Sequence, residues 1–269
     1  MNDRSPLGEK HEESVARAGA AATASQPVID ARGLHLAFGE QVVLEDISFQ
    51  VYESEALAIL GASGVGKSTI LKIILRLLVP DSGEILIDGE DISQLSFEEV
   101  LQVRQKMGMV FQAAALFDSL SVYENVAFPL REHLQHLSED EVRERSRAAL
   151  AMVDLDLDDF GDRLPAELSG GQKKRVGIAR AIVHEPKVLL YDEPTTGLDP
   201  LTSRLIIDLM QRLQRELDVT AIVVSHDVRM VMAVATHVAM LRDRRIIFYG
   251  TPQEMTRTEN EYVRDFIDR

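Results

Sequence analysis

Apolar residues recur along this chain with two spacings, one typical of strands and one typical of helices. At 33–38 (GLHLAF) and 42–51 (VVLEDISFQV), β-branched and aromatic residues alternate in part with polar ones, which predicts antiparallel strands. The runs at 56–60 (ALAIL), 187–193 (KVLLYDE) and 220–227 (TAIVVSHD) are nearly continuous, as in strands buried on both faces. Two kinds of sheet are therefore expected.

Turn and cap signals divide the rest of the pattern. The segment EILIDGEDI at 84–92 has an Asp88–Gly89 turn, which predicts a hairpin. Ser96 with Glu99, and Ser138 with Glu141, have the spacing of capping boxes that begin helices. Because strands alternate with helices, the fold class is expected to be α/β with a mostly parallel core sheet.

The pattern also suggests how the chain is organised. Residues 1–27, rich in Ala, Ser, Glu and Gly, are expected to form a disordered leader, and 28–250 to form one folding unit. The helical spacing at about 130–183 predicts a helical subdomain inserted at about 113–183. Residues 251–269 are expected to form a C-terminal helical tail.

Composition narrows the function classes. The chain has 269 residues, 45% of them hydrophobic, and a formal net charge of −15, which argues against nucleic acid as the main partner. There is no cysteine, so neither disulfides nor thiolate metal sites are available. The most apolar stretch, 70–79 (ILKIILRLLV), is shorter than the ~20 residues of a membrane span and contains Lys72 and Arg76. No segment is expected to cross a membrane.

A glycine-rich segment, GASGVGKST, fits the pattern G-x-x-x-x-G-K-[ST] and stands between a predicted strand and a predicted helix. Its glycines let backbone N–H groups converge on phosphate oxygens, Lys67 can reach the β- and γ-phosphates, and the Ser68 hydroxyl can bind Mg²⁺. The predicted nucleotide-binding loop comprises Gly61, Ala62, Ser63, Gly64, Val65, Gly66, Lys67, Ser68 and Thr69.

Two carboxylates follow the apolar run VLLY. Asp192 is expected to hold Mg²⁺ through water, and Glu193 to polarise the attacking water. A solvated turn would also place two acidic residues at a strand end, but the phosphate loop favours the catalytic interpretation. Lys67 and Glu193 are therefore predicted catalytic residues.

The segment ELSGGQKKRVGIARA at 167–181 is the most specific in the chain. Ser169, Gly170 and Gly171 would begin a helix and offer donors to a phosphate, although one chain needs only one phosphate cradle. A two-fold dimer would explain this second anion site, because each nucleotide would lie between the loop of one subunit and the serine–glycine turn of the other.

With these motifs the chain resembles the ATP-binding cassette (ABC) ATPases over about residues 28–250. The resemblance implies a P-loop NTPase cassette with an antiparallel β subdomain beside the core sheet. It implies that Phe38 stacks on adenine and that Gln112 senses Mg²⁺ and the membrane partner. It also implies that His226 contacts the γ-phosphate as a third catalytic residue. Ser169, Gly170, Gly171 and Gln172 would bind nucleotide across a dimer interface that Asp199 borders. Ser68, Gln112 and Asp192 would form the metal site, with ATP and Mg²⁺ as cofactors.

The stretch LREHLQHL at 130–137 leaves three interpretations open. His133 and His136 could share a helix face with Glu132 as a metal site, but no third strong ligand has a convincing spacing. The stretch could be a solvated helix. The preceding ALFDSLSVYENVAFPLREH resembles cassette subunits of MCE-type lipid transporters such as the Mla system, which favours a coupling role beside a permease groove at 113–137.

This resemblance implies an ATPase that moves phospholipid between inner and outer membrane. Its partners would be a second copy of the chain, an integral-membrane permease, and MCE-domain and STAS-domain proteins, with no nucleic acid. The chain would lie on the cytoplasmic side of the inner membrane, held there by the permease. The alternatives are a lipoprotein-release or cell-division cassette, a non-transport cassette, and a small-molecule kinase, the last of which leaves LSGGQ unexplained.

Overall fold

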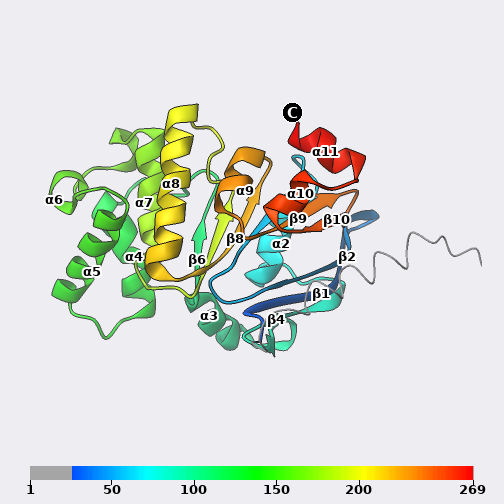
Figure 1. Cartoon of the computed structure of the whole chain (residues 1–269). Helices are drawn as coiled ribbons and strands as arrows, with labels where there is room; N and C mark the ends of the chain where they lie inside the picture. Colours follow the sequence, from blue (N-terminus) through cyan, green and yellow to red (C-terminus); the bar gives the residue numbers. More distant parts are fainter. Residues whose placement is uncertain (1–25, 269) are drawn as a thin grey trace, which may run out of the picture.

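Two β-sheets, ten α-helices and two short 3₁₀ turns are found in residues 26–268, the part of the chain that the computed structural model describes. Figure 1 shows α4 to α7 gathered at one end, beyond α8, and the antiparallel strands β1, β2 and β4 at the other. The predicted leader at 1–27 lies, except for residues 26 and 27, outside the described residues. The domain boundaries at 28–250, 113–183 and 251–269 remain predictions.

The first sheet is antiparallel, with the strand order β2-β1-β4-β5. Its strands are β1 (Ile29–Phe38), β2 (Gln41–Val51), β4 (Ser82–Ile87) and β5 (Glu90–Asp91). The β4–β5 hairpin turns through Asp88 and Gly89, both with positive φ, as the Asp–Gly pair predicts. Both strand predictions at 33–51 are confirmed.

The second sheet has the order β10-β9-β3-β8-β7-β6. Neighbours from β9 to β6 are parallel, and only the edge strand β10 is antiparallel. The strands are β3 (Ala56–Leu60), β6 (Met107–Val110), β7 (Val188–Asp192), β8 (Thr220–Ser225), β9 (His237–Arg242) and β10 (Arg245–Gly250). The expected α/β class with a mostly parallel core sheet is therefore confirmed.

Both faces of this parallel sheet are covered, as its continuous apolar runs predict. On β7, Val188 and Leu190 pack with the antiparallel sheet and α2 (Lys67–Ile74), which fills the space between the sheets. Leu189 and Tyr191 point the other way, into a core shared with the helices. The carboxyl ends of β3, β7 and β8 thereby stand on a rigid platform, and the predicted site residues follow them.

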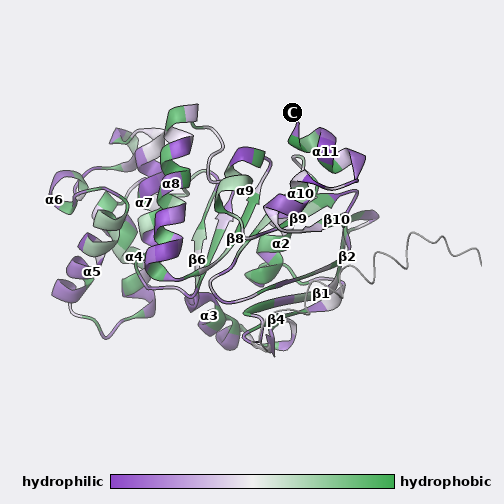
Figure 2. Cartoon of the chain, in the orientation of Figure 1, coloured by the Kyte–Doolittle hydropathy of each residue, from purple (hydrophilic) through white to green (hydrophobic). Residues whose placement is uncertain are grey.

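The remaining helices cover the second face and the ends of the sheet. They are α3 (Phe97–Gln105), α4 (Val122–His133), α5 (Glu139–Met152), α6 (Leu157–Phe160), α7 (Gly170–Ile182), α8 (Pro200–Leu217), α9 (Val228–Val234), α10 (Pro252–Thr256) and α11 (Glu261–Ile267), with two short 3₁₀ turns, Ile92–Gln94 and Pro165–Glu167. On α8, Ile206, Leu209, Met210 and Leu213 form one buried stripe, visible as alternating colours in Figure 2.

Local sequence signals set the helix starts. The capping boxes at Ser96–Glu99 and Ser138–Glu141 are both formed, so these two predictions are confirmed. The stretch LREHLQHL, however, is not one helix: α4 ends at His133, and the chain turns before Ser138 caps α5. His133 and His136 therefore do not share a helix face, because only the first of them is helical.

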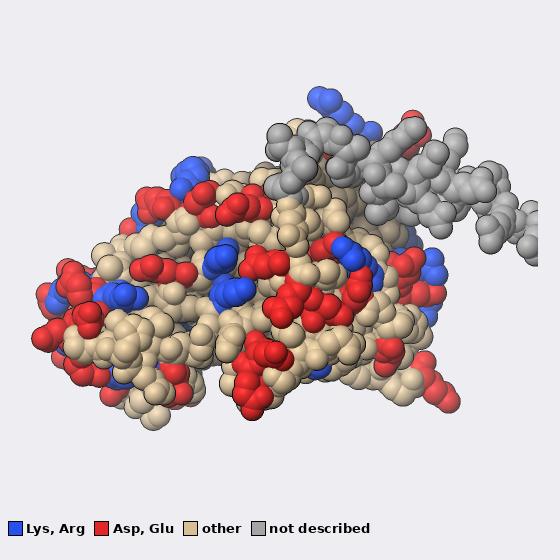
Figure 3. All heavy atoms as spheres, turned by 90° about the horizontal axis from the view of Figure 1, so that it is seen from below, with Lys and Arg blue, Asp and Glu red and all other residues tan. Residues whose placement is uncertain are grey.

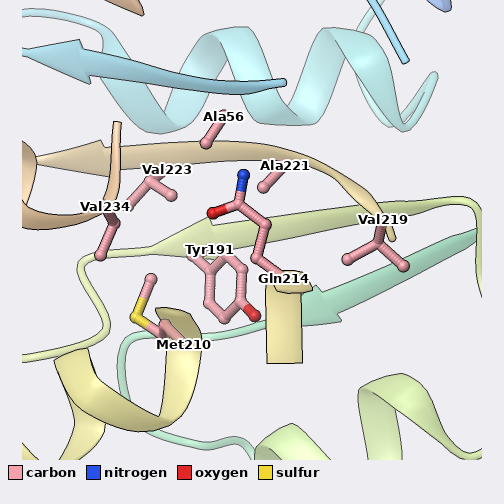
Figure 4. Close-up of a pocket in the computed structure, with 8 residues that line it drawn as sticks. All are labelled: Ala56, Tyr191, Met210, Gln214, Val219, Ala221, Val223 and Val234. Atoms are coloured by element: carbon pink, nitrogen blue, oxygen red, sulfur yellow. The ribbon is translucent and has the colours of Figure 1, made fainter. Parts of the chain in front are cut away.

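A small closed pocket lies inside the helical face of the sheet (Figure 4). Its volume of about 10 Å³ is that of a single water, so it is an imperfection of core packing rather than a ligand site. Its lining side chains come from β3, β7, β8, α8, α9 and the turn before β8: Ala56, Tyr191, Met210, Gln214, Val219, Ala221, Val223 and Val234. Among residues 26–268, no helix is both long and apolar enough to cross a membrane.

Candidate functional site

The predicted phosphate loop connects β3 to α2. Gly66 caps the helix with φ of +106°, a left-handed conformation that favours glycine. A Cβ on Gly61 would lie 2.5 Å from the carbonyl oxygen of Leu241, so the first glycine lets the loop start close against β9. The loop has the backbone geometry that the motif requires, with the N-terminus of α2 pointing into it.

Lys67 lies at the centre of this loop and is 5% exposed. Its ammonium donates to the carbonyl oxygens of Gly61 and Ala62, at 3.0 Å each, and lies 3.2 Å from Oε1 of Glu193. A buried ammonium needs such partners, because desolvation would otherwise cost several kcal/mol. The lysine is held over the space that a phosphate would enter, in contact with the carboxylate that follows β7.

Ser68 and Asp192 meet across the sheet, 124 positions apart in sequence. The Ser68 hydroxyl donates to Oδ1 of Asp192 at 2.7 Å. A hydroxyl beside a carboxylate is an oxygen-only set of the kind that Mg²⁺ prefers. The Ser68–Asp192 pair therefore fits a magnesium ion, for which the sequence also predicts Gln112 as a ligand.

Glu193 is 8% exposed and its carboxylate has three polar neighbours. Besides Lys67, the ring nitrogen Nδ1 of His226 lies 2.8 Å from Oε2, and the Thr196 hydroxyl donates to the same oxygen at 3.3 Å. Its backbone φ of +47° is left-handed, which turns the side chain away from the line of β7. The structure thus brings the three predicted catalytic residues, Lys67, Glu193 and His226, into one group.

The serine–glycine turn begins α7, as predicted. Ser169 caps the helix by accepting from the amide of Gln172, and the Gln172 side chain accepts from the amide of Ser169. A Cβ on Gly171 would lie 2.6 Å from a methyl of Thr202, so this glycine allows α7 to pack closely on α8. Within residues 26–268, no hydrogen bond or ion pair joins Ser169, Gly170, Gly171 or Gln172 to the Lys67 group.

Three further predicted residues form no hydrogen bond or ion pair with that group among residues 26–268. Asp199 caps α8 by accepting from the amides of Leu201 and Thr202, and these bonds, with the Thr202 hydroxyl, lower the pKa of its carboxyl. Phe38 ends β1 with 53% of its surface exposed. The exposed Gln112 follows β6, and its carbonyl oxygen binds a lysine of α7.

That lysine, Lys174, was missed by the sequence reasoning. It is 4% exposed, on a face of α7 that also carries the buried Gly177, Ile178 and Ala181. A signal was available: Lys174 occupies a position of the i, i+3, i+4, i+7 apolar stripe, where a charge is rare unless it has a defined partner.

A groove of about 400 Å³ opens beside α4 and α7. It is mainly apolar, with the rings of Phe117 and Phe128 4.8 Å apart, and His133 and His184 add polar edges at a ring separation of 6.3 Å. Its lining residues are Met107, Gly108, Met109, Phe111, Ala115, Phe117, Phe128, Pro129, His133, Arg180, Ala181 and His184.

Of residues 130–137, only His133 lines this groove. Arg131 turns away to Glu139, with a 2.7 Å ion pair, and lies over the ring of Tyr123. No group of three His, Cys, Asp or Glu side chains able to hold a metal occurs in the described part of the chain. The metal interpretation of His133 and His136 therefore has no geometric support.

The chain is similar to known proteins over most of its length. Residues 44–196 match the family model described as ABC transporter. The chain is 40% identical over 243 residues to the intermembrane phospholipid transport system ATP-binding protein MlaF of Haemophilus influenzae, covering 90% of this chain and 91% of that protein. It is 37% identical to the probable ribonucleotide transport ATP-binding protein mkl of Mycobacterium leprae, covering 89% and 68%.

The fold agrees as well. The solved dimer of the ATP-binding cassette MJ0796, in a post-hydrolysis state bound to ADP and Pi, has a TM-score of 0.75 and 33% identity, covering 83% of this chain and 98% of that one. With the phosphate loop, the two carboxylates and the serine–glycine turn all in the matched region, the chain belongs to the ABC transporter family and is one of its ATP-hydrolysing cassettes.

Proposed function

We propose that this cassette powers the movement of phospholipid between the inner and outer membrane, as a dimer attached to an integral-membrane permease. The observation that carries the proposal is the similarity to a phospholipid-transport cassette over nine-tenths of both chains. The groove beside α4 and α7 supports the attachment, because a mainly apolar hollow of this size suits a short helix of a membrane partner.

The site residues carry the following proposed roles. The amides of Gly61–Thr69 bind the phosphates and Lys67 offsets their charge, while Phe38 stacks on the adenine. Glu193 accepts a proton from the water that attacks the γ-phosphate, giving ADP and phosphate. Mg²⁺, held by Ser68, Asp192 and Gln112, would supply positive charge to the phosphate oxygens. His226 orients Glu193 through their 2.8 Å contact and faces the γ-phosphate.

A second copy of the chain would complete each site. Ser169–Gln172 form a capped helix start whose free N–H groups suit a phosphate, yet this turn is not bonded to its own chain's Lys67 group. Asp199 would border the same interface. In a two-fold dimer the turn of one subunit would face the phosphate loop of the other, so that ATP is shared between the two chains.

The remaining partners follow from the proposed lipid role. The cassette would lie on the cytoplasmic side of the inner membrane, held there by the permease, with MCE-domain and STAS-domain proteins in the same complex. Nucleic acid is not an expected partner: acidic side chains outnumber basic ones on the face shown in Figure 3, so this face has no continuous basic surface for phosphates.

The test is reconstitution of the cassette and its permease in vesicles, with transfer of a fluorescent phospholipid measured beside ATP turnover. We expect ATP-dependent lipid transfer that Glu193→Gln abolishes. Turnover stimulated by a lipoprotein, or by a ribonucleotide as cargo, with no lipid transfer, would refute the lipid assignment and favour a different cargo within the same family.

A further inference from the structure

Two side chains of helix α7 donate hydrogen bonds to three backbone carbonyl oxygens of the loop that contains Gln112. The ammonium of Lys174 donates to the carbonyl oxygen of Gln112. Further along the helix, the guanidinium of Arg180 donates to the carbonyl oxygens of Ala114 and Ala115, at 2.8 Å each. Between these contacts, a Cβ on Gly177 would lie 3.3 Å from the Ala114 carbonyl oxygen, so helix and loop are closely packed. Residues 112–115 are called the Gln112 loop below.

The Gln112 loop needs such support, because its backbone is strained. Ala114 and Ala115 have φ of +60° and +48°, two successive left-handed residues that are not glycine. Such residues are unfavourable for L-amino acids with a Cβ, so the conformation persists only where surrounding contacts fix it. The carbonyl oxygens that α7 binds belong to these same residues and to the glutamine before them.

Lys174 is an unusual residue for such a contact, because its charged side chain is buried. It is almost fully buried, and burial lowers its pKa, while the charges of Asp192 and Glu193 act in the opposite direction. Within residues 26–268 its side chain forms no ion pair with a carboxylate; its one hydrogen bond is to the Gln112 carbonyl oxygen. A buried cation is costly, so an apolar residue at this helix position would give a more favourable core unless the charge serves a purpose.

We infer that Lys174 is a positioning residue of ATP hydrolysis: it fixes the Gln112 loop through the carbonyl oxygen of Gln112. The inference rests on the proposed roles of Gln112, Asp192 and Glu193. Because α7 begins at Ser169, one helix then joins the turn that faces a second subunit to the loop that helps to bind Mg²⁺. Lys174 itself touches neither ATP nor the attacking water.

The geometry separates this role from nucleotide binding. Lys67 and the amides of Gly61–Thr69 do not depend on the Lys174 contact, so ATP affinity without Mg²⁺ should be preserved when Lys174 is changed. A loosened Gln112 loop should instead weaken the use of Mg²⁺ and slow the chemical step. The expected signature is a loss in kcat with little change in KM for ATP.

The experiment compares Lys174→Met, Lys174→Arg and the control Lys173→Met in the full chain. Lys173 is the preceding lysine, and within the described residues it forms no hydrogen bond or ion pair with the Gln112 loop. We measure kcat, KM for ATP, the Mg²⁺ concentration for half-maximal activity, and amide hydrogen exchange of the nucleotide-free protein. For Lys174→Met we expect kcat to fall roughly ten-fold, the Mg²⁺ requirement to rise several-fold and KM to change less than about three-fold.

Hydrogen exchange gives a readout that does not need turnover. In Lys174→Met the amides of residues 112–116 should exchange roughly ten times faster, while β7 and α8 keep their protection. Lys174→Arg should restore kcat, the Mg²⁺ requirement and protection to near the original values, because it keeps a charged donor. Lys173→Met should behave as the unchanged protein. If Lys174→Met does not fold, Lys174→Gln, a neutral donor of similar length, is measured in its place and should also raise the Mg²⁺ requirement.

The inference is overturned if the loss of charge at Lys174 leaves kcat and the Mg²⁺ requirement unchanged, or if Lys173→Met causes the same loss. It is also overturned if residues 112–116 already exchange freely in the unchanged protein. Glu193→Gln, measured in the same assay, separates the two proposals. Full turnover in that variant would refute the proposed site, whereas its loss beside an unaffected Lys174→Met would refute this inference alone.

Discussion

The ammonium of Lys67 lies 3.2 Å from a carboxylate oxygen of Glu193, so the proposed phosphate ligand and the proposed base form an ion pair. The γ-phosphate must therefore compete with Glu193 for this lysine. At the same time, the carboxylate repels the incoming phosphate.

Glu193→Gln should accordingly separate binding from turnover. An amide accepts no proton from water, so hydrolysis should stop, while affinity for a non-hydrolysable ATP analogue should rise roughly ten-fold as a charge-assisted contact is removed from Lys67. Calorimetric titration beside phosphate release measures both. Glu185→Gln, which changes an exposed carboxylate, is the control. Unchanged turnover in Glu193→Gln would contradict the assignment.

Lys67→Ala should have the opposite effect on binding. It removes a charge-assisted contact to the β- and γ-phosphates and leaves Glu193 buried without a cation, so nucleotide affinity should fall by roughly 10²-fold. Lys72→Ala removes an exposed lysine from the same helix and should bind as before. The measurement is equilibrium titration with ATP, and equal affinities for both variants would refute the role of Lys67.

Most of the fold could be predicted, because the signals were local. Apolar runs marked the strands buried on both faces, and serine–glutamate spacings marked the starts of α3 and α5. The grouping of Lys67, Glu193 and His226 was expected, although only from the family resemblance for His226. Their contact at the ends of β3, β7 and β8 is a product of strand order, which no local signal contains.

The features that escaped prediction depend on long-range contacts. Lys174 lies within a motif, but its importance comes from a carbonyl oxygen 62 positions away. The stretch LREHLQHL suggested a shared helix face, yet Leu134 leaves helical geometry and the α5 cap starts a new helix soon after. Of its residues only His133 lines the groove, whose far wall is formed by α7. A groove is made by tertiary packing, so the sequence indicated its neighbourhood but not its members.

The dimer proposal predicts a selective defect at the serine–glycine turn. Ser169→Arg places bulk and charge where the second subunit's nucleotide should dock, so ATP-induced dimerisation should fall at least ten-fold while the monomer still binds ATP through Lys67. Dimerisation is measured by light scattering in the presence of ATP. Both proteins carry Glu193→Gln, so that the nucleotide is retained.

The helix cap at Ser169 needs its own control. Ser169→Ala removes the bond to the Gln172 amide without adding bulk, and should cost about 1 kcal/mol of stability. Ser169→Thr keeps the hydroxyl and the cap and should be nearly neutral for stability. A dimerisation defect in Ser169→Ala as large as that in Ser169→Arg would mean that the cap, rather than the interface, is responsible.

Asn125 supports the groove by binding the backbone of Phe117, one of the groove's lining residues. Fully buried on α4, it accepts from the amide of Phe117 and donates to the carbonyl oxygens of Phe117, Leu120 and Ser121. Asn125→Ala leaves these groups without partners and should lower the free energy of unfolding by about 2–3 kcal/mol. Chemical denaturation measures the loss. Gln102→Ala, an exposed amide on α3, should change it by less than about 0.5 kcal/mol, and similar losses in both variants would contradict the supporting role.

His184 should make the groove sensitive to acid. Burial lowers its pKa below 6.5; its hydrogen bond to the Met107 carbonyl oxygen acts the other way, and nearby His133 lowers the pKa further. The buried Nδ1 has no hydrogen-bond partner among the described residues, so a proton added there would find no acceptor. Because the native pKa is the lower one, the unfolded chain binds this proton first as pH falls. The contribution of His184 is constant above about 6.5 and becomes unfavourable to the native state below it.

His184→Gln should therefore reduce the loss of stability between pH 7.5 and pH 5.0, because glutamine keeps an amide donor for Met107 and cannot titrate. Urea unfolding at the two pH values measures this loss in both proteins. Carboxylates whose pKa is lowered, such as Glu139 beside Arg131 and Asp158 beside Arg147, also lose native stability in acid, but equally in both proteins, so the difference isolates His184. The His133→Gln variant should show a smaller effect of the same sign, since His133 acts on His184 only through its charge. Identical pH dependence in the unchanged protein and His184→Gln would show that the groove tolerates the protonated ring.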